Sequence, residues 1–311
     1  MNELLVADVG GTGTRFARCS AGGKPGQIAT YLNTEFASFE ALLDDYLSRS
    51  GSVPDAAAFA VAGPVANQEV HMTNLGWHLS ASQLQRDSGI AGIEIMNDFA
   101  ALAWATLSIP ASEVVAISGG QADPRGNRVV LGPGTGLGMG ALVGGPGHWQ
   151  VVAGEGGHVT MPAYTAEEAQ LIADVFREFG HCSAERLLSG SGLARIYSFV
   201  GGGAAAPHQV TERGRAGEAA ACEALELFNC MLGTVAANAA LTFGSVGGVY
   251  LAGGILPAIA DTFIASGFRR RFDDRGRFSD YLRTMPVYLM MQDYPALSGL
   301  QYFMTEQRTT D

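Results

Sequence analysis

Three glycine-rich turns in this 311-residue chain each follow a short apolar run. They lie at Gly10–Gly13, Gly134–Gly138 and Gly253–Gly254, and the first two include Thr12 and Thr135. Glycine has no Cβ, so successive backbone N–H groups can converge on an anion and a phosphate can approach the chain closely. The three turns together predict a nucleotide that is held by the backbone at several points. Carboxylate-rich segments between them predict a polar acceptor for its phosphoryl group.

Asn97 and Asp98 stand between a strand-like run, Ile93–Met96, and a helical run, Phe99–Leu107. An aspartate in front of a helix can cap its N-terminal N–H groups. It can also act as a general base at the carboxyl end of a buried strand, where α/β proteins place ligands. Phosphoryl transfer to an alcohol needs a carboxylate that accepts the hydroxyl proton. Both interpretations of Asp98 stay open, and Asn97 would fix a second hydroxyl.

Glu155 and His158 form a second polar cluster, separated by two glycines that keep the turn tight. A sugar hydroxyl both donates and accepts hydrogen bonds, so a carboxylate and an imidazole suit it together. The alternative is a surface turn with a solvated glutamate. Glu185 falls in the first turn of a short helix, where the helix dipole favours a carboxylate with or without a ligand. Asp8, before the first glycine turn, can orient Mg²⁺ or simply start a turn.

Composition excludes several classes of protein. The 30 acidic residues exceed the 19 basic ones and give a net charge of −11, so neither nucleic acid nor an anionic membrane is predicted as a partner. Lys24 is the only lysine and lies in no Gly-Lys-Ser/Thr loop, which excludes Walker-type nucleotide binding and the protein-kinase pattern. Four cysteines without a C-x-x-C pair, no signal peptide and no apolar run of about 18 residues predict a cytoplasmic protein.

The elements that would position these residues alternate between strands and helices, which predicts an α/β fold. A chain of 311 residues exceeds a usual single core, so two domains are expected. The segment Val129–Val143 repeats the strand, glycine turn and strand of the N-terminus, which favours two related lobes. Thr165 and Glu168 predict a capping box for a helix to about Phe179, and Ser183 predicts the cap of the next short helix.

Seven motifs follow one another in an order that resembles the bacterial ATP-dependent glucokinase family, of the actin-like ATPase superfamily. The resemblance covers nearly the whole chain, to about Gly299. The motifs are Asp8-Val9-Gly10-Gly11-Thr12, Met72-Thr73-Asn74, Ile95-Met96-Asn97-Asp98-Phe99, Gly134-Thr135-Gly136-Leu137-Gly138, Gly154-Glu155-Gly156-Gly157-His158-Val159, Ser183-Ala184-Glu185-Arg186 and Ala252-Gly253-Gly254-Ile255.

The resemblance implies a two-lobed actin-like (ribonuclease H-like) ATPase fold with a central cleft that holds the active site. The small α/β lobe would comprise residues 1–108 plus 299–311, and the large α/β lobe residues 109–298. The implied activity is transfer of the ATP γ-phosphoryl group to the 6-hydroxyl of glucose. A homodimer whose lobes close on the sugar is also implied.

The family's site residues carry over to positions of this chain. Asp98 would be the catalytic base, and Asp8 would hold Mg²⁺ directly or through water. The sugar would be bound by Asn97, Asp98, Glu155, His158 and Glu185. The nucleotide would be bound by Asp8, Gly10, Gly11, Thr12, Gly134, Thr135, Gly136, Gly253 and Gly254.

One departure from the family pattern is Gly13, where an asparagine is more usual, so a side-chain contact near the sugar or phosphate would be missing. The cysteine-rich zinc motif of the related repressor and kinase group is absent after His158, so no structural zinc is predicted. Two alternatives remain: a hexose kinase with another sugar or phosphoryl donor, and a sugar-sensing regulator without catalysis. The absence of a basic helix disfavours the regulator.

Overall fold

The computed structural model describes residues 3–20 and 23–310, which form two compact units. Unit 1 comprises Met1–Pro110 and Gln292–Asp311, and unit 2 comprises Ala111–Met291. The chain returns to unit 1 at Gln292, earlier than the predicted residue 299. Helix α12 (Pro295–Thr310) follows and packs on helix α3 (Asp98–Ala105) of the same unit. A Cβ at Gly299 would lie 1.9 Å from the carbonyl oxygen of Ala101 in α3, so position 299 is inside this contact rather than at a boundary.

Unit 1 is built on a five-stranded sheet in the order β3-β2-β1-β4-β7. Strand β1 pairs antiparallel with β2 and parallel with β4, and β4 pairs parallel with β7. Every residue of β4 is buried, as expected for a central parallel strand covered on both faces. The strands are β1 (Glu3–Val9), β2 (Gly13–Ser20), β3 (Ala29–Leu32), β4 (Ala56–Val61) and β7 (Gly92–Asn97), with a separate hairpin of β5 (Glu69–Met72) and β6 (Trp77–Ser80).

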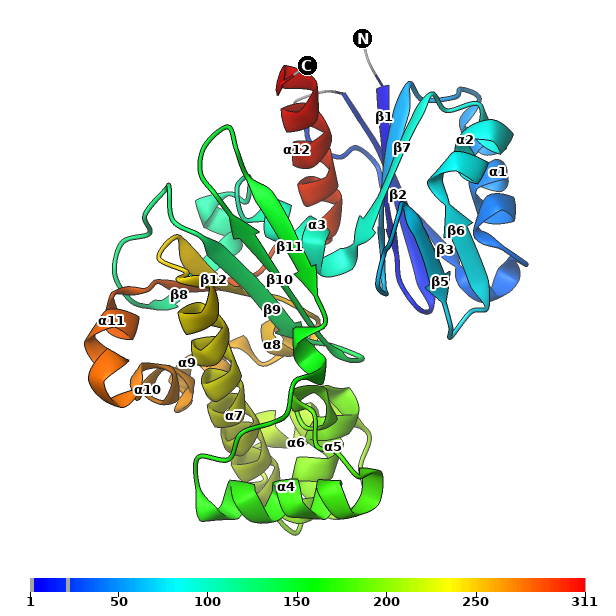
Figure 1. The fold of residues 1–311 in the computed structure, drawn as a ribbon. Coiled ribbons are helices and arrows are strands. Elements are labelled where there is room, and N and C mark those ends of the chain that lie inside the picture. Colours follow the sequence, from blue (N-terminus) through cyan, green and yellow to red (C-terminus); the bar gives the residue numbers. More distant parts are fainter. Residues whose placement is uncertain (1–2, 21–22, 311) are drawn as a thin grey trace. The chain divides into compact units, whose positions relative to one another are not determined.

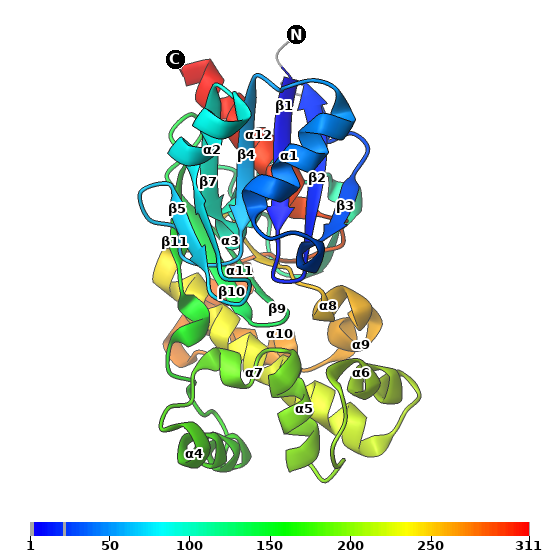
Figure 2. The same ribbon diagram turned by 90° about the vertical axis from the view of Figure 1, so that its right-hand side faces the viewer.

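Helices cover both faces of this sheet. Figure 2 shows α1 in front of the strands and α12 behind them, and α12 contacts both β1 and β4. Ser38 caps α1 with its side chain, and Gly51, at φ +73°, ends the helix in the left-handed conformation that glycine adopts without strain. The helices of unit 1 are η1 (Asn33–Glu35), α1 (Phe39–Ser50), α2 (Ala81–Ser88), α3 (Asp98–Ala105) and α12 (Pro295–Thr310).

Unit 2 contains a six-stranded sheet in the order β11-β10-β9-β12-β13-β8 (Figure 1). Its first five strands repeat the arrangement of unit 1, because β9 pairs antiparallel with β10 and parallel with β12, as β1 does with β2 and β4. The repeat predicted from the two glycine hairpins is therefore confirmed. The strands are β8 (Val114–Ser118), β9 (Arg128–Pro133), β10 (Leu137–Val143), β11 (Gln150–Gly154), β12 (Gly248–Leu251) and β13 (Val287–Met290).

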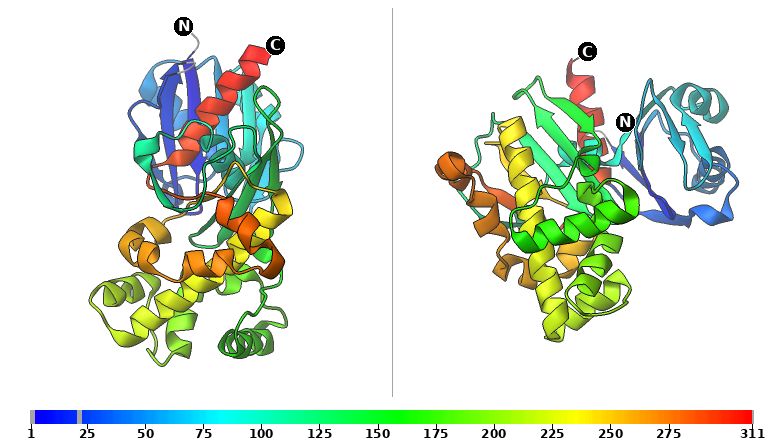
Figure 3. Two further views of the ribbon diagram at one scale, coloured as in Figure 1. Left: turned by 90° about the vertical axis from the view of Figure 1, so that its left-hand side faces the viewer. Right: turned by 60° about the horizontal axis from the view of Figure 1, so that its bottom comes forward.

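Helix α7 (Ala219–Phe243) runs through the core of unit 2, alongside α10, as Figure 3 shows. By length and composition it could cross a membrane, and among the described residues it is the one helix that meets this test. However, 83% of the apolar window is buried inside the structure, so its composition reflects the core. The other helices are η2 (Ala111–Glu113), η3 (Gly156–His158), α4 (Ala166–Phe179), η4 (Ala184–Arg186), α5 (Gly190–Phe199), α6 (Pro207–Arg215), α8 (Ile255–Ala258), α9 (Ala260–Ala265), α10 (Phe268–Asp273), η5 (Gly276–Phe278) and α11 (Ser279–Thr284).

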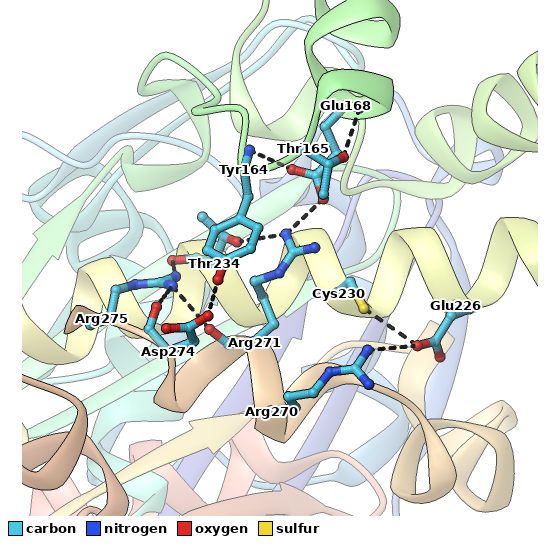
Figure 4. A network of polar contacts seen from close by, with 10 residues as sticks. All are labelled: Tyr164, Thr165, Glu168, Glu226, Cys230, Thr234, Arg270, Arg271, Asp274 and Arg275. Carbon is cyan, nitrogen blue, oxygen red and sulfur yellow. Dashed lines mark hydrogen bonds and ion pairs between the residues drawn. The ribbon is translucent and has the colours of Figure 1, made fainter.

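A buried ion pair joins α4 to α10 (Figure 4). Glu168 is fully buried and accepts a hydrogen bond from Arg271 Nη1 at 2.6 Å and another from the Tyr164 amide at 2.7 Å. The Arg271 guanidinium also lies over the Tyr164 ring, 4.0 Å from its centroid. Thr165 caps the helix as predicted, but Glu168 binds the amide of Tyr164 rather than that of Thr165, so the reciprocal half of the capping box is absent. Glu168 instead holds α4 against the core.

The substitution Arg271→Met is expected to lower the free energy of local unfolding of α4 by about 3 kcal/mol, because it leaves the buried Glu168 carboxylate without its cation. Native-state hydrogen exchange of the α4 amides measures that free energy directly. Arg270→Met is the matched control, since Arg270 is on the same helix with a side chain 82% exposed and only a 3.9 Å contact to Glu226. Equal exchange in the two variants would contradict a stabilising role for the pair.

Candidate active site

The predicted residues of unit 1 lie at one edge of its sheet. Val9 at the end of β1 is level with Val61 of β4, and Val61 is level with Asn97 of β7. These three strands are parallel, so their carboxyl ends meet at the same edge, which is where ligands bind in such sheets. The first glycine turn and the Asn97–Asp98 pair are therefore brought together, with β4 between them.

The first glycine turn is closed by a hydrogen bond from the Gly10 amide to the Gly13 carbonyl at 3.0 Å. Within residues 3–20 and 23–310, the amides of Gly11 and Thr12 donate no hydrogen bond, as an anion-binding turn requires. A Cβ at Gly11 would lie 2.5 Å from Nδ2 of Asn74, which comes from the β5–β6 turn. Asn74 was not predicted as a site residue, although it belongs to the Met72-Thr73-Asn74 motif.

Asn97, rather than Asp98, is the N-cap of α3. Its Oδ1 accepts hydrogen bonds from the amides of Phe99 and Ala100 at 2.9 and 3.3 Å, and its Nδ2 donates to the Gly63 carbonyl at 3.1 Å. Asp98 is the first helical residue, and its Oδ1 accepts from the Phe99 amide at 3.0 Å. Asn97 therefore occupies the N-cap position, and Asp98 accepts one N-terminal amide from the first position inside the helix.

Asp8 lies at the end of β1 with Arg15 3.6 Å away on the paired strand β2. Burial raises the pKa of the Asp8 carboxyl, and the positive charge of Arg15 partly offsets that rise. The Arg15 guanidinium also lies 5.0 Å from the ring centroid of Tyr294. Arg15 therefore forms an ion pair with Asp8 at the end of β1.

The second glycine turn, in unit 2, is tied to Glu185. Oε2 of Glu185 accepts a hydrogen bond from the Leu137 amide at 3.0 Å, and a Cβ at Gly136 would lie 2.3 Å from the same oxygen. The turn is closed by a hydrogen bond from the Gly134 amide to the Gly136 carbonyl, and the Gly190 amide donates to the Gly134 carbonyl. A predicted sugar-binding carboxylate thus contacts a predicted phosphate-binding turn.

Glu155 and His158 stand at the two ends of the short helix η3, and both are exposed. The glycines between them permit close packing, since a Cβ at Gly157 would lie 2.0 Å from the carbonyl oxygen of Leu137. Leu137 is also the residue whose amide Glu185 binds, so Glu155, His158 and Glu185 are gathered around the start of β10.

Two backbone hydrogen bonds tie the segment after His158 to the segment before Glu185. They run from the Ala184 amide to the Val159 carbonyl at 2.9 Å, and from the Met161 amide to the Cys182 carbonyl at 2.9 Å. Ser183 was predicted to cap the next short helix, but its side chain makes no capping hydrogen bond to η4, which spans Ala184–Arg186. These backbone bonds, not a side-chain cap, hold the segment of Glu185 in place.

The third glycine turn lies beside the second. Strands β9 and β12 are parallel, and a Cβ at Gly132 would lie 2.2 Å from the Ala252 carbonyl oxygen. Gly253 adopts φ +88°, and a Cβ there would lie 2.4 Å from the Pro133 carbonyl oxygen. Only glycine satisfies both the conformation and the space at position 253. Gly134–Gly136 and Gly253–Gly254 therefore occupy one edge of the unit 2 sheet.

Comparisons with known proteins agree with this arrangement. Residues 5–307 match the family model described as glucokinase. A glucokinase of Chromobacterium violaceum is 42% identical over 304 residues, which cover 95% of this chain and 87% of that protein. The crystal structure of a glucokinase from an Antarctic psychrotroph has a TM-score of 0.88 at 35% identity, covering 97% of this chain and 98% of that one.

More distant structures share the fold. A glucokinase from Balamuthia mandrillaris, solved in complex with glucose, has a TM-score of 0.81 at 21% identity and covers 97% of this chain and 93% of that one. The predicted α/β fold of the actin-like sugar kinases is confirmed by these structures. The chain therefore belongs to the glucokinase family, the enzymes that phosphorylate glucose with ATP.

Proposed function

We propose that this enzyme transfers the γ-phosphoryl group of ATP to the 6-hydroxyl of glucose, with Asp98 as the general base. One observation carries the assignment of the base. Asn97 supplies the cap of α3, while Asp98 lies at the carboxyl edge of the same sheet as the first glycine turn. A carboxylate at that edge can accept the hydroxyl proton as the oxygen attacks phosphorus.

Sugar recognition falls to Asn97, Glu155, His158 and Glu185 together with Asp98. Carboxylate oxygens accept from sugar hydroxyls, and an imidazole can donate to one hydroxyl or accept from another. The Asn97 amide nitrogen has two hydrogens, one of which goes to Gly63, so Asn97 can bind a hydroxyl while it caps α3. The exposure of Glu155 and His158 keeps their polar atoms accessible to a ligand.

Nucleotide binding falls to the three glycine turns. The amides of Gly11 and Thr12 would bind phosphate oxygens at the first turn, with Asp8 and Gly10 shaping its start. Gly134, Thr135 and Gly136 would bind phosphate at the second turn, where the Thr135 side chain is exposed. Gly253 and Gly254 would lie near adenosine, as the resemblance to the glucokinase family implies.

Mg²⁺ fits this donor set at Asp8. Among the residues that the structure describes, no three His, Cys, Asp or Glu side chains form a metal cluster. Mg²⁺ does not require one, since it keeps several waters and is commonly held by one or two carboxylates plus substrate phosphates. When bound, it would neutralise charge on the transferred phosphoryl group. Asp8, whose side chain is 23% exposed, can hold it directly or through water.

Coupled measurement of ADP release tests this proposal, with glucose, mannose, glucosamine and other hexoses as acceptors. We expect release from ATP and Mg²⁺ that depends on glucose. Release with another hexose alone would keep the mechanism and change the substrate. No release with any hexose, while glucose still binds, would contradict the kinase assignment with ATP as donor. ADP and polyphosphate would then be tested as donors against the sugar-sensing alternative.

A further inference from the structure

Asn33 forms hydrogen bonds with the first glycine turn and its flank, although it is about twenty residues away in the sequence. It begins the short helix η1 after β3, and its side chain is buried with 1% exposure. Its Nδ2 donates to the Gly10 carbonyl at 2.8 Å, and its Oδ1 accepts from the Thr14 hydroxyl at 2.8 Å. Its backbone amide donates to the Thr12 carbonyl at 3.0 Å. Asn33 thus contacts Gly10 and Thr12 of the turn and Thr14 just after it.

These contacts set the polarity of the turn. The carbonyl oxygens of Gly10 and Thr12 are bonded to Asn33, and that of Gly13 is bonded to the Gly10 amide. An anion is repelled by carbonyl oxygens and attracted by N–H groups, so a phosphate site needs the carbonyls turned away. With three carbonyls engaged in this way, the amides of Gly11 and Thr12 remain available to a ligand.

A turn of this composition needs such a restraint. Glycine loses more backbone freedom on ordering than any other residue, and three of the four residues at Gly10–Gly13 are glycines. The Thr14 hydroxyl is fully buried, so it also requires its partner in Asn33. A buried asparagine that bonds Gly10 with one polar side-chain atom and Thr14 with the other holds both ends of the turn in one conformation.

We infer that Asn33 is a positioning residue that orients the first glycine turn for the nucleotide phosphates. The inference rests on the proposed function, which makes this turn part of the nucleotide site. Asn33 itself is not required to contact ATP. It acts through the Gly10 and Thr12 carbonyls and through Thr14.

The test is steady-state kinetics of Asn33→Ala, with binding of Mg²⁺–ADP by calorimetry as a second readout. We expect the KM for ATP and the dissociation constant of Mg²⁺–ADP to rise about tenfold, as the loss of two buried hydrogen bonds would allow. The KM for glucose should change less than about twofold, because Asn97 and Asp98 keep their own contacts. Thr14→Val, which keeps the shape of the buried side chain, should give part of the same effect.

Asn127→Ala is the matched control. Asn127 also bridges two segments: its Nδ2 donates to the carbonyl of Phe243 at the end of α7 at 2.8 Å, and its Oδ1 accepts from the amide of Gly144 after β10 at 3.2 Å. It precedes β9, at the end of that strand away from Gly134. If Asn33 were merely structural, Asn33→Ala would lower the melting temperature and leave the KM for ATP as unchanged as Asn127→Ala does, and this outcome would overturn the inference.

Gly11→Ala separates this inference from the proposed function. Gly11 belongs to the turn, and a Cβ at this position would lie 2.5 Å from Nδ2 of Asn74. A raised KM for ATP in Gly11→Ala but not in Asn33→Ala would contradict the positioning role alone. An unchanged KM for ATP in both would contradict the assignment of the turn to the nucleotide. A rise in both variants, with wild-type behaviour in Asn127→Ala, supports the role of Asn33.

Discussion

Replacement of Asp98 by asparagine is expected to lower kcat by about 10²–10⁴-fold, the usual contribution of a general base. The substitution is nearly isosteric, and the side-chain oxygen of asparagine can still accept the hydrogen bond of the Phe99 amide. Asn97 remains the cap of α3, so the helix is not expected to lose its N-terminus. The KM for ATP should stay within about twofold, because the loss concerns the proton and not the phosphate turns.

Glu94→Gln provides the control for this loss of charge. Glu94 lies on the same strand, β7, and is also half-buried. This burial raises the pKa of its carboxyl. It has no proposed contact with sugar or nucleotide, and we expect its kcat to remain near that of the wild type. Near wild-type turnover in Asp98→Asn would rule out Asp98 as the base. A similar loss in both variants would point to a general effect on β7.

Much of the fold is predictable from local patterns. The two glycine hairpins predict the repeat because an apolar run, a glycine turn and a second apolar run specify an antiparallel pair in each unit. The residue at which the chain returns to unit 1 is not predictable in the same way. Pro295 begins α12 and Gly299 lies against Ala101 of α3, a contact between residues far apart in the sequence.

The candidate site shows a similar limit. Glycines and carboxylates at strand ends predict Asp8, Asp98 and the three turns, since their chemistry is local. The contact between Glu185 and the Leu137 amide has no sequence signal, because it depends on how η4 approaches β10. Asn33 has none either. Gly13 lacks the side chain that the family resemblance leads one to expect, and Asn33, from outside every motif, supplies polar contacts to the same turn.

Removal of the Glu185 side chain is expected to affect both substrates. Loss of a charged partner for a sugar hydroxyl should lower kcat/KM for glucose by about 10–100-fold. Glu185→Ala also removes the acceptor of the Leu137 amide, which orders the second glycine turn, so the KM for ATP should rise about tenfold. Initial rates measured across a matrix of glucose and ATP concentrations give both effects from one preparation of each variant.

Glu185→Gln separates the two roles. The amide oxygen of glutamine can still accept from the Leu137 amide, but the negative charge that we propose binds the sugar is gone. We therefore expect a normal KM for ATP and a reduced kcat/KM for glucose. Gly136→Ala keeps the charge of Glu185 but changes its position, because the new Cβ would lie 2.3 Å from Glu185 Oε2 and displace the carboxylate. If Gly136→Ala left both substrates unaffected, or if Glu185→Gln raised the KM for ATP as much as Glu185→Ala, Glu185 would not link the sugar to the phosphate turn.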